Sequence, residues 1–245
     1  MEIWLGSLLL VVGTAVGSFM VLFFRGTSLS SLNVSLSFAG GVMLTASFTS
    51  LILPAVEKGG FLKTALGVVL GFGVMALVER LFPHEHPTIG QEGILPLKMK
   101  KLTLIVVGII IHNIPEGLSV GIATAYSYSG KDGLATALAI SLQDIPEGLV
   151  VSLPIYALGG GMGTALAVGF LSGAIEGLFS LFGFGFMMVF EGLLPVGMGF
   201  GGGAMLYITV KEVFPEAYSE GKAFATTLGF LAGVLLMLFL DTVSL

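Results

Sequence analysis

Hydrophobic and polar positions along this chain fall into long apolar runs separated by short polar connections. A helix that crosses a bilayer needs about 20 apolar residues, and eight runs approach or exceed this length. The runs are Ile3–Phe24, Leu32–Val56, Phe61–Phe82, Leu102–Tyr126, Leu134–Leu158, Met162–Phe190, Leu193–Phe214 and Ala223–Leu240. The pattern predicts an all-α polytopic membrane protein with eight transmembrane helices, forming a single domain over residues 1–245.

Composition points the same way. Hydrophobic residues make up 55% of the chain and charged residues only 10%, whereas a soluble domain has about 25% charged residues. The first run lacks a basic segment before it and ends at Arg25-Gly26, so we interpret it as a membrane span and not a removable signal peptide. The absence of cysteine excludes disulfides and thiolate metal sites.

The basic residues near the ends of the runs predict the orientation. If both termini lie outside, seven basic residues are inside and three are outside. The inside set is Arg25, Arg80, Lys98, Lys100, Lys101, Lys211 and Lys222, and the outside set is Lys58, Lys63 and Lys131. We therefore expect a multi-pass protein of the cell (inner) membrane, with residues 84–101 as a cytoplasmic loop whose lysines contact anionic lipid.

A short internal similarity links the second and seventh runs. Phe38–Leu44 resembles Phe200–Leu206, and Pro54 and Pro215 follow at nearly the same offset. Five spans apart, the two segments cross the membrane in opposite directions. The pattern predicts that spans 1–3 and 6–8 form an inverted repeat around a central pair of spans 4 and 5, as in transporters with a site near the midplane.

A polar motif interrupts the fourth and fifth runs. Ile111–Leu118 recurs thirty-one residues later as Leu142–Leu149. The polar members are His112, Asn113 and Glu116 in one copy and Gln143, Asp144 and Glu147 in the other. Residues three or four apart share a helix face. Pro115 and Pro146 each free one backbone carbonyl, which a membrane tolerates only against protein or a water-filled cavity. Ionisable residues inside a span indicate a functional site.

Glu176, in the sixth run, adds a further carboxylate. Glu116, Asp144, Glu147 and Glu176 cannot all stay ionised in a low dielectric without cations, so they are either partly protonated or bind metal. One imidazole with carboxylate and amide oxygens suits Zn²⁺, Fe²⁺, Mn²⁺, Co²⁺ or Cd²⁺. The histidine argues against Mg²⁺ and Ca²⁺.

Several readings of these polar groups stay open. A buried histidine beside a glutamate is often a structural pair. A His-x-x-x-Glu pair with a metal could serve an intramembrane hydrolase, but the chain has no H-E-x-x-H motif. The carboxylates could also relay protons in a proton-coupled carrier of another solute. No P-loop is present, so the sequence gives no sign of ATP-driven transport.

The motif pair resembles the signatures of spans four and five in the ZIP family of divalent metal transporters, of the prokaryotic type. The resemblance covers the whole chain and implies uptake of Zn²⁺ into the cytoplasm, no organic cofactor and a homodimer. It implies a first metal site from His112, Glu116, Gln143, Asp144 and Glu147, and a second from Asn113, Glu116, Asp144, Glu147 and Glu176. It also places Met43 near the metal. Gln143 stands where many relatives carry histidine, which makes the site richer in oxygen. We expect metal ions and lipid as partners and no nucleic acid.

Two further groups of residues have less definite meanings. His84 and His86, in the longest loop, could capture metal, although a solvated loop explains them equally well. Glu212, Glu216 and Glu220 could guide a cation away from the site, but we interpret them as a solvated helix end.

Overall fold

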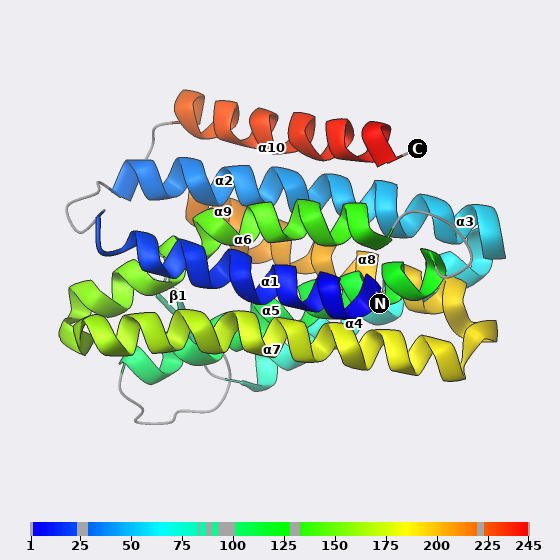
Figure 1. Ribbon diagram of the computed structural model, residues 1–245, viewed down its shortest axis with the longest axis horizontal. Helices are drawn as coiled ribbons and strands as arrows, with labels where there is room; N and C mark the ends of the chain where they lie inside the picture. Colours follow the sequence, from blue (N-terminus) through cyan, green and yellow to red (C-terminus); the bar gives the residue numbers. More distant parts are fainter. Residues whose placement is uncertain are drawn as a thin grey trace.

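The computed structural model describes residues 2–23, 29–82, 84–86, 90–92, 101–127, 133–219 and 223–244. Long helices account for most of them and lie side by side along one axis (Figure 1). Their bounds are α1 Glu2–Met20, α2 Leu29–Ala46, α3 Leu53–Gly59, α4 Phe61–Leu81, α5 Lys101–Ser127, α6 Gly133–Ile155, α7 Gly161–Val189, α8 Leu194–Ile208, α9 Phe214–Ala217 and α10 Ala223–Ser244.

The second and seventh apolar runs each form three consecutive helical segments. In the second run, the π-helical turn η1 (Ser47–Ile52) joins α2 to α3, and in the seventh, η4 (Thr209–Val213) joins α8 to α9. A proline stands in the first turn of both α3 and α9, where a missing N–H costs least. Two further short segments are η2 (Tyr156–Gly160) after α6 and the 3₁₀ turn η3 (Glu191–Leu193) before α8.

Four of the predicted runs correspond to single long helices. The third and sixth runs correspond to α4 and α7, and the unusually long sixth run is one unbroken helix of 29 residues. α5 and α6 continue through Pro115 and Pro146. The prolines therefore remove individual backbone hydrogen bonds without ending either helix.

The long loop between the third and fourth runs contains secondary structure that the hydropathy pattern did not predict. Strand β1 (His84–His86) pairs with β2 (Gly90–Glu92) as an antiparallel hairpin, with His84 opposite Glu92 and His86 opposite Gly90. The rest of residues 84–101, apart from Lys101 at the start of α5, lies outside the described residues.

The helices form an inner group of four and two outer pairs. α1 packs against α6 and α7, and α5 packs against α7 and α6. Outside this group, α2 packs against α10, and α4 packs against α8. α2 also contacts α6, and α5 also contacts α8, so these contacts join the outer pairs to the inner group.

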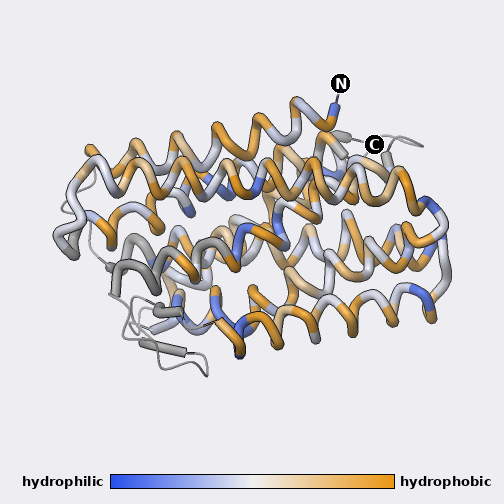
Figure 2. The backbone as a smooth tube through the Cα atoms, turned by 90° about the horizontal axis from the view of Figure 1, so that it is seen from below, coloured by the Kyte–Doolittle hydropathy of each residue, from blue (hydrophilic) through white to orange (hydrophobic). Residues whose placement is uncertain are grey.

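The outer surface of the bundle is apolar. Large hydrophobic side chains on α4 and α10, such as Val69 (69% exposed) and Phe224 (80% exposed), face outward. Apolar residues dominate the helices along their length (Figure 2). Among the residues searched, six helical stretches are long and apolar enough to cross a membrane. The chain is therefore a multi-pass membrane protein.

Candidate metal centre

Three helices carry the polar residues singled out in the sequence. α5 carries His112, Asn113 and Glu116, α6 carries Gln143, Asp144 and Glu147, and α7 carries Glu176. Most of these side chains are almost completely buried, with exposed fractions of 0–2% for Asn113, Glu116, Gln143, Asp144 and Glu176. The structure therefore places the strongest hydrogen-bonding groups of the motif inside the bundle, where polar groups are costly unless they find partners.

Gln143 connects the two copies of the motif. Its Nε2 donates to Glu116 Oε1 at 2.5 Å and to Glu147 Oε2 at 3.1 Å. The first bond joins α6 to α5, and the second links residues four apart on α6. The predicted meeting of the two motif copies is therefore observed, with the amide of Gln143 between two carboxylates.

Glu176 joins this cluster from α7. The Asn113 amide lies beside its carboxylate, and Ser172 Oγ donates to Asn113 Oδ1 at 3.0 Å. On the side of α1, Thr14 Oγ1 lies 3.5 Å from Glu176 Oε2. Asp144 is close enough to Glu176 and Glu116 for the carboxylates to repel one another electrostatically. We call Asn113, Glu116, Gln143, Asp144, Glu147 and Glu176 the carboxylate cluster.

Glycines next to the motif glutamates bring the helix backbones together. A Cβ atom on Gly117 would lie 2.2 Å from the backbone oxygen of Glu176, and one on Gly148 would lie 2.3 Å from that of Thr14. No side chain fits at such distances, so only glycine allows α5 to approach α7, and α6 to approach α1, this closely.

The cluster contains several buried oxygen atoms that accept no hydrogen bond. They are Glu116 Oε2, Gln143 Oε1, Asp144 Oδ2 and Glu176 Oε1. Buried acceptors are normally satisfied, and each exception calls for a physical explanation. A cation is one species that would satisfy several of them together.

The side chains do not form a closed cage. Within the described part of the chain, no three His, Asp or Glu side chains are placed to hold one metal ion together. The hydrogen bonds give the reason, since Gln143 spans Glu116 and Glu147, and His112 Nε2 is paired with Glu212 Oε2. Ligand binding would require these side chains to exchange partners.

Met43 lies apart from these polar contacts. It is 2% exposed and belongs to the largest apolar core cluster, which also includes Ile111 and Met205. Packing accounts for its burial.

Glu212 was misjudged as part of a solvated helix end. It is 1% exposed and Glu216 is 9% exposed, because η4 and α9 pack against α2 and turn this part of the chain into the bundle. Glu220 lies outside the described residues. Glu212 falls within the predicted run Leu193–Phe214, and this position was the signal that should have marked it as an ionisable residue inside a span.

A second polar group lies next to Glu212. Glu79 on α4 is 3% exposed, accepts a hydrogen bond from the Tyr207 hydroxyl, and forms an ion pair with Lys211 Nζ at 3.1 Å. Electrostatic interactions connect Glu79 to both Glu212 and His112. Glu79 also lies within a predicted run, so its position in the sequence carried the same signal as that of Glu212.

Comparisons with known proteins agree on one family. The family model described as ZIP Zinc transporter matches residues 83–241. Zinc transporter ZIPB of Bordetella bronchiseptica is 37% identical, over 94% of this chain and 77% of that protein. Zinc transporter GufA of Myxococcus xanthus is 35% identical, over 78% of this chain and 79% of that protein. Zinc transporter ZupT of Streptococcus mutans is 31% identical, over 92% of this chain and 91% of that protein.

The family match includes both polar motifs, the hairpin and the buried acids of α7 and η4. Members of this family are transporters and not enzymes, which excludes the hydrolase reading of the His-x-x-x-Glu pair. The signatures in α5 and α6, the apolar bundle around them and the extent of these matches lead to one conclusion: the chain belongs to the ZIP family of zinc transporters.

Proposed function

We propose that this protein carries divalent metal ions, chiefly Zn²⁺, across the cell membrane into the cytoplasm. The observation that carries the proposal is the carboxylate cluster, in which buried oxygens of Glu116, Asp144 and Glu176 lack hydrogen-bond partners inside a membrane bundle. The similarity to proteins named as zinc transporters supports zinc as the substrate. Cd²⁺, Fe²⁺, Mn²⁺ and Co²⁺ suit the same donor atoms.

Two adjacent metal sites would share the cluster. His112, Glu116, Gln143, Asp144 and Glu147 would form the first, and Asn113, Glu116, Asp144, Glu147 and Glu176 would form the second. The bond from Gln143 to Glu116 supports the first grouping, and the proximity of Asn113 to Glu176 supports the second. The shared carboxylates would bridge the two ions, and Met43 would be a peripheral ligand at most.

His112 and Glu212 extend this path along α5 and η4. The imidazole is 22% exposed, and its Nε2 faces Glu212, which is buried in η4. A metal ion leaving the carboxylate cluster would find both an imidazole and a carboxylate there. The orientation predicted from the basic residues makes this end of the protein cytoplasmic.

An inverted repeat supports a transport cycle with two access states. Gly67 on α4 packs against the backbone oxygen of Val196, and Gly229 on α10 packs against that of Val34. The two contacts are related by a shift of 162 positions in the sequence: Gly229 lies 162 residues after Gly67, and Val196 lies 162 residues after Val34. Gly71 with Phe200 and Gly233 with Phe38 repeat the relation. The same displacement relates the π-helical turns that begin at Ser47 and Thr209.

The same arrangement supports the prediction of eight spans in a single domain. α5 has 27 residues and α6 has 23, enough to cross a bilayer, and both pack within the bundle that contains the six stretches long and apolar enough to cross a membrane. The chain ends lie toward the same end of the bundle (Figure 1), as an even number of spans requires. The charge pattern favours outside for both ends and the cytoplasm for residues 84–101, where His84 and His86 would meet metal that has just entered the cytoplasm. The homodimer remains a prediction.

Radiometal flux tests the function. Purified protein in proteoliposomes should accumulate ⁶⁵Zn²⁺, and His112→Ala or Glu147→Ala should lower the initial rate to near that of empty vesicles. Glu191→Gln, an exposed acid in η3, serves as the control and should leave the rate unchanged. Absent flux in the wild type, or full flux in both alanine variants, would contradict the proposal. A proton-coupled carrier of another solute would instead show acidification of the vesicles with no metal present.

A further inference from the structure

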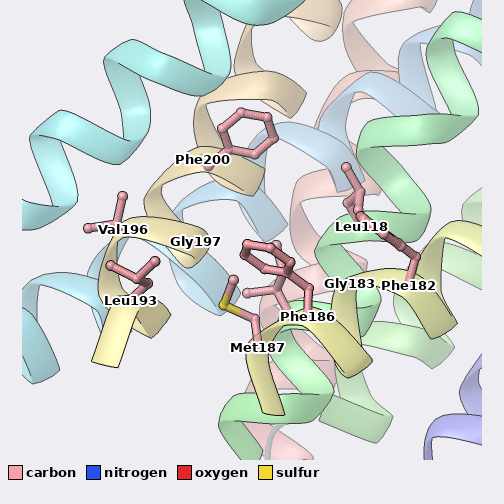
Figure 3. Close-up of a pocket in the computed structure, with 10 residues that line it drawn as sticks. Leu118, Phe182, Gly183, Phe186, Met187, Leu193, Val196, Gly197 and Phe200 are labelled. Carbon is pink, nitrogen blue, oxygen red and sulfur yellow. The ribbon is translucent and has the colours of Figure 1, made fainter. Parts of the chain in front are cut away.

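An apolar cavity of about 340 Å³ lies between α5, α7 and α8. Figure 3 shows Phe186 and Met187 of α7 and Phe200 of α8 around one space, with Leu118 of α5 beside it. No polar surface lines the cavity. The carboxylate cluster contributes none of its residues, so the cavity is separate from the proposed metal path.

The cavity runs from the outer surface of the bundle into its core. At the rim, Phe182, Phe186 and Leu193 are 61%, 42% and 49% exposed. At the floor, Ile122 and Met187 are 3% and 5% exposed. The exposed rim belongs to α7 and η3, at the apolar surface that a membrane protein presents to lipid tails.

The packing of the helices creates this space. α5 packs against both α7 and α8, whereas α7 and α8 are hardly in contact with each other. Gly197 lets the Met187 side chain lie against the backbone of α8, because a Cβ atom there would lie 2.6 Å from Met187 Sδ. A larger side chain at Gly197 would therefore fill the cavity and meet only the flexible end of a methionine.

We propose that this cavity binds one acyl chain of a membrane lipid. Protein interiors are close-packed, and a space of this size at the lipid boundary is filled by whatever apolar material adjoins it. Water is excluded because no lining group can hydrogen bond to it. A lipid headgroup is excluded from the cavity for the same reason. The proposal requires only that the helices cross a membrane, so it does not depend on the function proposed for the carboxylate cluster.

Photo-crosslinking in nanodiscs tests the proposal. The probe is a phosphatidylcholine with a diazirine near the end of one acyl chain, and labelled residues are identified by peptide mass spectrometry. Bulk lipid reaches Phe224 on α10 but not the floor of the cavity. We expect label on Met187 as well as on Phe224. In Gly197→Leu, label on Met187 should be lost while label on Phe224 persists.

Two further variants keep the result interpretable. Gly185→Leu places the same change on α7 where a Cβ atom meets nothing within 4 Å, and it should preserve both labels. Val196→Phe fills the cavity from α8 without altering a glycine and should also remove the label on Met187. Wild-type protein without label on Met187, or label on Met187 in both cavity-filling variants as strong as in the wild type, would overturn the proposal.

Discussion

At the residue scale, the amide of Gln143 is the centre of the site. It donates to two acidic side chains while its own Oε1 accepts no hydrogen bond. An amide can hold two carboxylates together through its N–H groups and still offer its oxygen to a metal ion. In the proposed metal site, glutamine in place of histidine would keep a ligand at this position, and its bond to Glu116 links α6 to α5.

Replacing Gln143 separates these roles. Gln143→Ala removes both donors and one ligand, so we expect Zn²⁺ uptake to fall by about 10- to 100-fold, the range seen when a supporting partner of a metal site is lost. Gln143→His restores a ligand and should retain most of the uptake. Initial rates of ⁶⁵Zn²⁺ entry into proteoliposomes provide the comparison, and equal rates in the two variants would be inconsistent with a ligand role.

Glu212 provides the second residue-scale prediction. Glu212→Gln removes the charge paired with His112, and we expect uptake to fall by about tenfold because the imidazole loses the partner that orients it. Glu216→Gln is the matched control, since Glu216 is also largely buried and belongs to α9 rather than to the His112 contact. Uptake that falls equally in both variants would point to general instability of this segment.

At the scale of elements, the close contacts of α5 with α7 and of α6 with α1 depend on Gly117 and Gly148, the glycines next to the motif glutamates. The sequence predicted the motif faces and their closeness, because i, i+3 and i, i+4 spacing is a local property of a helix. It did not predict that η4 turns Glu212 inward, because burial there depends on α9 packing against α2, two segments far apart in the chain. The hairpin at His84–Glu92 was missed because three-residue strands carry little hydropathy signal.

A methyl group at Gly117 should therefore be damaging. In Gly117→Ala the new Cβ meets the backbone of α7, which cannot move aside as a side chain could, so we expect a loss of about 1–3 kcal/mol of stability. Gly163→Ala, in the same helix pair but with nothing within 4 Å of its Cβ position, should be neutral or slightly stabilising. Thermal unfolding in detergent measures both. A Gly117→Ala protein as stable as Gly163→Ala would disprove the close contact.

At the scale of the whole molecule, the apolar runs were sufficient to predict the helical bundle. Each described helix lies within or close to a predicted run, because the need for about 20 apolar residues is strict in a membrane. The pairing of α2 with α10 and of α4 with α8 could not be read from the sequence, because apolar faces in lipid do not distinguish one partner from another. Glycine spacing decides these contacts.

The orientation of the bundle is testable with single cysteines, because the natural chain has none. Glu57→Cys, exposed near the end of α3, should react with a membrane-impermeant maleimide in intact cells. Ser219→Cys, exposed after α9, should react only after permeabilisation. The opposite pattern would place both termini in the cytoplasm and reverse the direction assigned to the path past Glu212.

The central claim is that the carboxylate cluster binds two metal ions. Anomalous diffraction at the zinc edge from crystals soaked in Zn²⁺ tests it most directly. We predict two neighbouring peaks, one bounded by His112 and Gln143 and the other by Asn113 and Glu176, with Glu116 between them. A single peak at His84 and His86, or no peak within the cluster, would contradict the claim.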